Sequence, residues 1–351
     1  MEEVIHAIEA LVAAETKPDV LQLSGGEPTT HPEFEQILEY ALTQPIQYVM
    51  VNTNGIRLSN DDALVDLLAA SRNRIEVYLQ MDGVTDDVYL KLRGKPLWEI
   101  KKRALDRITS KGIHVTLVST LQAGVNDHQL GDLLALAASN PCITGLSLQP
   151  ATYSGRHVLP EDLEQRCTFP DVIKGLCEQS QGLYNEDDFF PLPCAHPNCH
   201  ILSLAYRHEG KLIPLTRFVD AKSNLDLLAN GLSFTRGEGM RLIKQYLARN
   251  QCCGSEGCCD TGEPPSEVDQ AANAFFEEAL SKQLGAEQLF RITITSFLDA
   301  YNFDIRRVMK CCTHHVLPSG HIIPFCAYNV LYRNGHIPLP SLSSANRAEN
   351  L

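Results

Sequence analysis

The stretch Leu21-Gln22-Leu23-Ser24-Gly25-Gly26-Glu27-Pro28-Thr29 decides the fold of this 351-residue chain. Its first residues continue a buried strand from Val20, and the two glycines end that strand. In folds that alternate strands and helices, ligands bind at the carboxyl ends of the strands. Glu27 therefore either faces a ligand ammonium group or holds the turn. A double glycine alone also fits a simple strand-to-helix turn, so the neighbouring segments must decide.

Strands and helices alternate on from this turn to about residue 150. Short apolar runs predict strands at 20–23, 48–51, 75–79, 114–119 and 143–148. Runs with near-helical spacing predict helices at 2–15, 32–41, 59–68, 98–108 and 130–138. Ser59 is expected to cap the helix that runs through Leu68. This alternation predicts a parallel sheet with right-handed crossovers, as a barrel or a doubly wound sheet.

The chain opens on a helix, whereas an array of this kind normally begins with a strand that covers the sheet edge. We therefore expect the chain to begin inside a repeat; a helical extension is the alternative. After residue 160 the regular alternation of strands and helices ends. The sequence there predicts a strand at 291–297 and a hairpin from 315–317 and 322–325. We expect residues 1–159 to form a partial barrel, residues 160–340 a cysteine-rich domain and residues 341–351 a disordered tail.

Composition excludes several classes of protein. The net charge of −13 gives no basic face for nucleic acid. No apolar run approaches the ~18 residues of a membrane span. The start Met1-Glu2-Glu3-Val4 lacks the basic segment of a secretory signal. These features predict a cytoplasmic protein without a nucleic-acid partner.

The 12 cysteines are unevenly distributed along the chain. Nine lie in the second half, and we expect them to bind metal: Cys194, Cys199, Cys252, Cys253, Cys258, Cys259, Cys311, Cys312 and Cys326. A disulfide framework suits small secreted domains, which this chain does not resemble. Zinc is the main rival to iron, but the spacings are not those of Cys-x2-Cys zinc sites. The other three cysteines are expected to be ordinary thiols.

Three strand ends together resemble the radical S-adenosylmethionine (SAM) superfamily. They are Gly-Gly-Glu-Pro at 25–28, Thr53-Asn54-Gly55, and Gln80-Met81-Asp82-Gly83 followed by Arg93-Gly94. The resemblance implies a partial (β/α)6 barrel that lacks its first strand, and SAM as cofactor. It implies that SAM is bound by Gly25, Gly26, Glu27, Pro28, Asn52, Thr53, Gln80, Asp82 and Ser119.

One departure from this superfamily is large. Its defining Cys-x3-Cys-x2-Cys motif gives three thiolates to a catalytic 4Fe–4S cluster, and that spacing occurs nowhere in this sequence. We therefore expect this chain alone to be inactive without a SAM-cluster segment, and its status as an enzyme stays open. Three accounts are a truncated chain or gene model, a split enzyme and a degenerate relative.

The second half narrows the resemblance to the tetraether lipid synthase group. The motifs are Pro-Leu-Pro-Cys-x-His-Pro-x-Cys from Pro191 and Cys-Cys-x-His-His-Val-Leu-Pro-x-Gly from Cys311. This resemblance implies C–C bond formation or C–H modification on lipid chains, with two auxiliary 4Fe–4S clusters and an electron donor such as ferredoxin or flavodoxin. A lipid substrate is compatible with peripheral membrane contact. The alternatives are a radical SAM methylase of a pterin-like small molecule and a non-catalytic metal-binding fragment.

Overall fold

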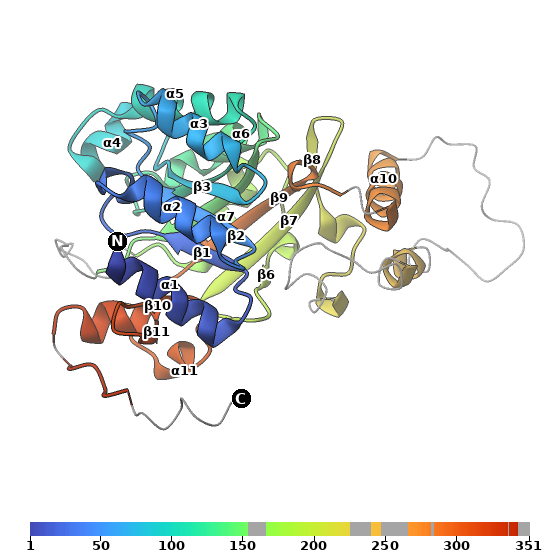
Figure 1. Ribbon diagram of the computed structural model, residues 1–351. Helices are drawn as coiled ribbons and strands as arrows, with labels where there is room; N and C mark the ends of the chain where they lie inside the picture. Colours follow the sequence, from blue (N-terminus) through green and yellow to red (C-terminus); the bar gives the residue numbers. More distant parts are fainter. Residues whose placement is uncertain (154–165, 225–239, 247–265, 282–283, 336, 343–351) are drawn as a thin grey trace, which may run out of the picture.

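Six parallel strands form the centre of the described fold (Figure 1). They are β1 (Val20–Leu23), β2 (Tyr48–Thr53), β3 (Ile75–Gln80), β4 (His114–Leu121), β5 (Ile143–Pro150) and β9 (Leu289–Thr295). Each pairs in parallel with the next. This computed structural model describes residues 1–153, 166–224, 240–246, 266–281, 284–335 and 337–342. The predicted mixed α/β fold with a parallel sheet is confirmed.

Antiparallel strands extend this sheet beyond β9. β7 (His200–His208) pairs with β9, and both β6 (Phe190–Pro191) and β8 (Lys211–Pro214) pair with β7. A separate hairpin joins β10 (His314–Val316) to β11 (Ile322–Pro324). Within the described residues the sheet stays open, because β1 pairs with β2 alone.

Helices cover the outer face of the parallel strands (Figure 1). Among them, α2 (Phe34–Thr43), α3 (Asp62–Ala70), α5 (Trp98–Ser110) and α6 (Leu130–Ala138) pack on this face. The fold also contains α1 (Glu2–Glu15), α4 (Asp86–Arg93), α7 (Phe169–Gln179), α10 (Glu267–Ser281), α11 (Ile305–Val308) and α12 (Phe325–Ala327). The large core packs apolar residues of α2, α3, α5 and α6 against the strands. α1 lies beside the β10–β11 hairpin.

The two faces of the strands differ in polarity. Ile75, Val77 and Leu79 of β3 are buried in the core with the helices. Glu76 and Tyr78 alternate with them and therefore lie on the opposite, inner face. There the Tyr78 hydroxyl donates to Ser147 Oγ at 2.6 Å. The inner face thus carries polar groups across β3 and β5.

A second core lies beyond this sheet, around α10. Phe275 of α10 packs with Phe218 and Tyr206, with ring centroids 5.3 and 5.5 Å apart. This core belongs to the predicted cysteine-rich domain. However, β9 from the same predicted domain pairs with β5, so the two predicted domains share one sheet. The boundary at residue 159 itself stays a prediction.

The five strands expected before residue 150 begin at the predicted residues and run up to two residues further, whereas the strand expected at 291–297 lies two residues earlier, at Leu289–Thr295. The β10–β11 hairpin and the strand near 291 are also present. The cap predicted at Ser59 is wrong. Asp61 caps α3, because its carboxylate accepts from Leu64 N at 3.0 Å, whereas Ser59 Oγ donates to the Ile56 carbonyl. Asp is as good a cap as Ser, and it stands directly before the first helical residue.

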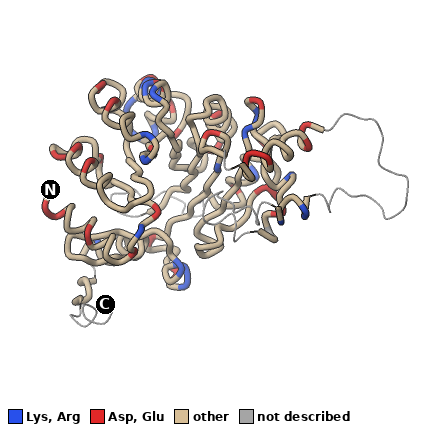
Figure 2. Tube along the Cα trace, turned by 45° about the vertical axis from the view of Figure 1, so that its right-hand side comes forward, with Lys and Arg blue, Asp and Glu red and all other residues tan. Residues whose placement is uncertain are grey.

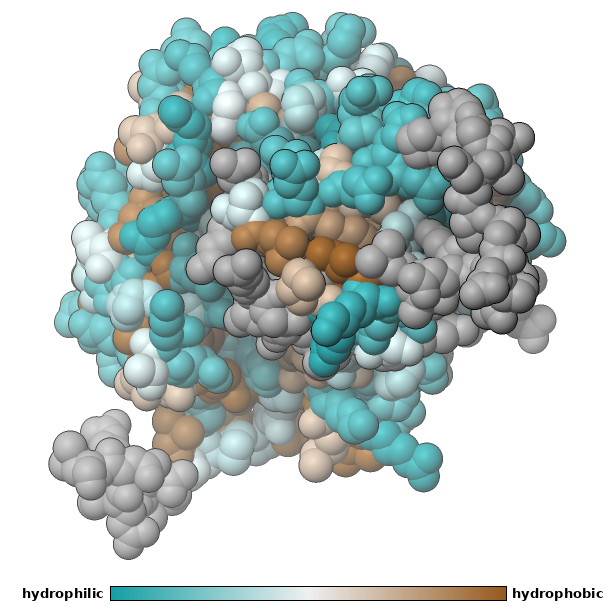
Figure 3. All heavy atoms as spheres, turned by 90° about the vertical axis from the view of Figure 1, so that its right-hand side faces the viewer, coloured by the Kyte–Doolittle hydropathy of each residue, from teal (hydrophilic) through white to brown (hydrophobic). Residues whose placement is uncertain are grey.

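In the view of Figure 2, lysines and arginines alternate with acidic residues over the described part of the chain. The face in Figure 3 carries an apolar area between hydrophilic residues. No described helix is long and apolar enough to span a membrane.

We expect Asp61→Ala to lower the free energy of unfolding by about 1 kcal/mol, the usual value of a helix cap. The pKa of Asp61 is lowered, and the hydrogen bond from the Leu64 N–H is the largest cause. Its stabilisation is therefore present above pH ~4 and is lost as the pH falls through the lower folded-state pKa. Denaturant titrations at pH 7 and pH 3 measure both effects. The exposed neighbour is the control: Asp62→Ala should cost less, and equal losses would contradict the assignment of the cap.

Candidate functional site

The Gly-Gly-Glu-Pro turn lies at the carboxyl edge of the parallel strands. Gly25 and Gly26 have φ values of +112° and +50°, and a Cβ added at either would meet no atom within 4 Å. Both are exposed. Side-chain-free backbone beside open space suits close approach of a ligand. Pro28 opens a short helical turn, Pro28–Thr30, directly after Glu27.

Glu27 points into the protein and ties two strand ends together. Its Oε1 accepts from Thr29 Oγ1 at 2.6 Å and from Thr53 Oγ1 at 2.7 Å, and its Oε2 accepts from Asn54 N at 2.6 Å. Thr29 and Thr53 are almost fully buried. Of the two roles left open by the sequence, the geometry gives Glu27 that of holding the turn.

A buried lysine of α5 bonds the same loop after β2 that Glu27 holds. Lys101 of α5 is 0% exposed, and its ammonium donates to the carbonyl oxygen of Asn54. Burial lowers the pKa of Lys101 to about 8, and the charges of Asp82 and Glu27 oppose that shift. Asn54 is thus held at both ends of its backbone: its N–H bonds to Glu27 and its carbonyl oxygen to the Lys101 ammonium. Sequence reasoning missed Lys101, because a lysine in an amphipathic helix normally faces solvent.

The network continues to β3 and β4 through Asp82. This carboxylate is fully buried, and it accepts from Arg93 Nε at 2.8 Å and from Thr120 N at 3.1 Å. With its amide turned so that the oxygen faces Arg93, Gln80 also accepts from this guanidinium. The Asp82 carboxylate is therefore already bonded to donors of the protein, and it holds the end of β4 to the loop after β3.

The remaining predicted residues lie at the same edge. Ser119 is 0% exposed, and its Oγ donates to the Asp82 carbonyl oxygen at 3.4 Å. Asn126, which the sequence did not single out, donates to that carbonyl at 2.8 Å. Asn52 is half-buried on the inner face, and its side chain has no hydrogen bond to the described residues. The structure thus gathers all the predicted strand-end residues, although several of them are internal braces.

Tyr78, Ser147 and Gln149 form a polar row beside this edge on the inner face. Gln149 Nε2 donates to the Tyr78 oxygen at 3.1 Å, and that hydroxyl donates to Ser147. Burial raises the pKa of Tyr78, so it remains a neutral hydrogen-bonding group. The sequence held a signal for this row: Ile75-Glu76-Val77-Tyr78-Leu79 alternates strictly, which predicts one polar face.

Three of the predicted metal-binding cysteines meet at one place. Cys199, Cys311 and Cys326 come from separate segments and line one cavity of about 20 Å³ together with His200. The Leu298 N–H donates to Cys326 Sγ at 3.3 Å, and burial raises the pKa of Cys326 to about 11. Burial also lowers the pKa of His200 to about 4. This cavity lies at the carboxyl end of β9.

Two further cysteines lie near these three. Cys194 and Cys312 contact each other, and desolvation together with the adjacent Cys194 thiol raises the pKa of Cys312. Within the described residues, no three His, Cys, Asp or Glu side chains form a site for a single metal ion. The other predicted ligands, Cys252, Cys253, Cys258 and Cys259, lie outside the described residues.

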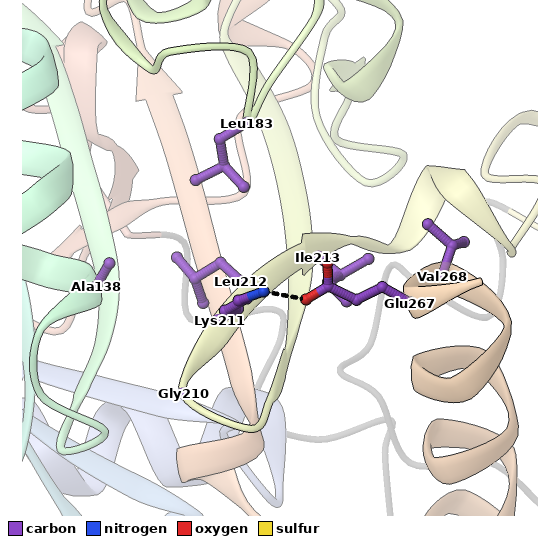
Figure 4. A pocket seen from close by; sticks show the side chains of 8 residues that line it. All are labelled: Ala138, Leu183, Gly210, Lys211, Leu212, Ile213, Glu267 and Val268. Carbon is purple, nitrogen blue, oxygen red and sulfur yellow. Dashed lines mark hydrogen bonds and ion pairs between the residues drawn. The ribbon is translucent and has the colours of Figure 1, made fainter. Parts of the chain in front are cut away.

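A second cavity lies at the edge of the sheet opposite to the one where β/α folds hold their active sites. It measures about 400 Å³ and lies between the β7–β8 turn, α10 and the end of α6 (Figure 4). An ion pair between Lys211 and Glu267, 2.6 Å long, crosses it. The β7–β8 turn lies near the amino end of β9. Ligands of β/α folds bind at the opposite, carboxyl edge.

Comparisons with known proteins show similarity to one superfamily of enzymes. A family model described as the Radical SAM superfamily matches residues 1–137. The chain is 32% identical over 342 residues to the 7,8-dihydro-6-hydroxymethylpterin dimethyltransferase of Methanocaldococcus jannaschii, covering 89% of this chain and 67% of that protein. It is 32% identical over 117 residues to mycofactocin maturase MftC of Mycobacterium ulcerans, covering 33% and 31%. A solved structure of anSMEcpe with bound AdoMet is 16% identical, with TM-score 0.38 and coverage of 51% and 50%.

We expect the stability of the wild type relative to Lys101→Met to rise with pH. The folded-state pKa of Lys101 is about 8 and its ordinary value is 10.5. The unfolded chain therefore binds more protons between these values, and the difference between wild type and variant should move in favour of the wild type by about 3 kcal/mol from pH 8 to pH 10.5. Urea unfolding across this range measures it. The exposed neighbour in Lys102→Met should show no such trend, and a flat difference for Lys101→Met would show that the ammonium is not buried.

Proposed function

The chain belongs to the radical SAM superfamily, and we propose that it binds SAM at the carboxyl edge of β1–β4 for radical modification of a C–H bond in a pterin-like small molecule. One observation carries the choice of substrate. The inner face beside the Gly-Gly turn is lined by hydrogen-bonding side chains, Tyr78, Ser147 and Gln149. These groups bond to one another, and a polar heterocycle can use their remaining donors and acceptors, whereas a hydrocarbon chain would cover them without adding a hydrogen bond.

The residues of the turn fit SAM. The exposed Gly25–Gly26 backbone, open on its Cβ side, can accept the amino group of the methionine moiety, as the family resemblance implies. Asn52 has a half-buried side chain directed to the same inner face. Glu27, Asp82 and Lys101 hold these strand ends in place, so the site is preorganised before ligand arrives.

When bound, SAM and a reduced 4Fe–4S cluster supply a radical that abstracts hydrogen from an unactivated C–H bond. The described residues contribute binding and orientation. Tyr78 and Gln149 are placed to hold a substrate by hydrogen bonds. No side chain of the network is free to move a proton, because Glu27 and Asp82 are occupied by internal donors.

Auxiliary iron is the second part of the proposal. Cys199, Cys311 and Cys326 face one space from three segments, and the residue pair Cys194 and Cys312 can supply a fourth thiolate. Cysteine thiolates are the usual ligands of 4Fe–4S clusters, and three of them already line this space. A second cluster would use cysteines among 252–259. A ferredoxin or flavodoxin is the electron donor that such a protein would need.

A lipid chain is the second candidate substrate. What favours it is the likeness of the segments from Pro191 and Cys311 to the tetraether lipid synthase group. The name of the Methanocaldococcus jannaschii relative instead refers to a pterin, and that relative matches 89% of this chain. We therefore place the pterin-like substrate first.

The SAM site is tested by Glu27→Gln. The amide would turn one donor toward Thr53 or Asn54, which are donors themselves. We expect the dissociation constant for SAM to rise about tenfold, equal to about 1.4 kcal/mol, in calorimetric titrations of the chain purified without oxygen. Glu39→Gln, at an exposed position of α2, is the matched control. Equal affinities of Glu27→Gln and wild type would contradict the role of Glu27.

The substrate is tested by quenching of pterin fluorescence with 7,8-dihydro-6-hydroxymethylpterin as probe. Removal of one hydrogen-bonding group from the inner face should cost about 1 kcal/mol of binding, so Gln149→Ala should bind the probe about fivefold more weakly. Gln179→Ala, a variant on α7 away from this face, should bind it like the wild type. Failure of the wild type to bind the pterin, together with binding of a long-chain alkyl phospholipid, would support the lipid candidate instead.

A further inference from the structure

Arg307 of α11 is a buried cation beside the three cysteines. Its side chain is 8% exposed. Its Nε donates to Cys199 Sγ at 3.3 Å, and its Nη2 donates to the carbonyl oxygen of Ser296. The guanidinium forms no ion pair with a carboxylate of the described residues. Its direct partners are thus a sulfur atom and a neutral carbonyl.

A guanidinium buried in this way is stabilised by an anion close to it. Arginine stays charged in proteins, and a buried charge without a counter-charge is costly. A carbonyl oxygen offers only a partial charge. Cysteinate sulfur bound to iron would give the missing negative charge at the atom that Nε already faces. The surroundings of Arg307 therefore point to an anionic group on Cys199.

We propose that Arg307 is the counter-charge of a 4Fe–4S cluster held by Cys199, Cys311 and Cys326, and that it raises the reduction potential of this cluster. This inference rests on the auxiliary cluster of the proposed function. Reduction adds negative charge to the cluster, so a fixed cation and a hydrogen bond to a ligand sulfur stabilise the reduced state. The Leu298 N–H, bonded to Cys326 Sγ, acts in the same direction. Arg307 is a positioning and tuning residue, since it acts through the ligands.

The experiment uses the full chain with Cys252, Cys253, Cys258 and Cys259 changed to serine, so that any second cluster is removed. This background chain is reconstituted without oxygen and should hold about four irons and four sulfides. Its midpoint potential is measured by a redox titration followed by electron paramagnetic resonance. Arg307→Gln should shift the ratio of oxidised to reduced cluster at a fixed potential at least tenfold toward oxidised, or about 59 mV for one electron.

Arg306→Gln is the matched control, because the neighbouring Arg306 is exposed; its midpoint should equal that of the background. Arg307→Lys keeps the charge but loses the planar donor, so a smaller shift of the same sign is expected. Full iron content with an unchanged midpoint in Arg307→Gln would overturn the role of Arg307 while leaving the cluster intact. A background chain without iron and sulfide would overturn the cluster itself. If Arg307→Gln does not fold, the midpoint of Arg307→Lys decides in the same way.

Discussion

The carboxylate of Glu27 is the interaction on which the site depends. It takes donors from its own turn and from the end of β2, so one side chain fixes the distance between two neighbouring strands. Behind it, the buried ammonium of Lys101 bonds the same β2 loop. The two groups have opposite charge, and each lowers the cost of burying the other. The exposed glycine backbone that a ligand would contact is therefore held by groups that a ligand does not touch.

This division between holding and contacting groups also accounts for the other strand ends. Asp82 and Ser119 are both fully buried and bonded to neighbours, Asp82 to Arg93 and Ser119 to the Asp82 backbone. Asn52 and Tyr78 lie on the inner face. A ligand at this edge would meet glycine backbone and neutral polar side chains. The charges lie in the layer beneath, where they stiffen the strand ends.

The sequence predicted the parallel strands well because each is a short apolar run closed by glycine, asparagine or a turn. It predicted the glycine turn because few turns have two glycines before Glu-Pro. It missed Lys101 because burial of a lysine depends on which face of α5 meets the strand ends, and that is a tertiary property. It also placed the cap of α3 at Ser59, since Ser59 and Asp61 are both good caps and only the backbone geometry selects between them.

β9 crosses the predicted division of the chain into a barrel and a cysteine-rich domain. It comes from the second half but runs parallel to β5, so its carboxyl end reaches the same edge of the sheet as the Gly-Gly turn. The segment after β9 carries Ser296 and Leu298, which bind Arg307 and Cys326. Cys199, just before β7, joins them because β7 is antiparallel to β9. Strand pairing that no local pattern reveals thus brings the cysteines to the edge where the Gly-Gly turn lies. A cluster held there would belong to the same sheet edge as SAM, rather than to an independent domain.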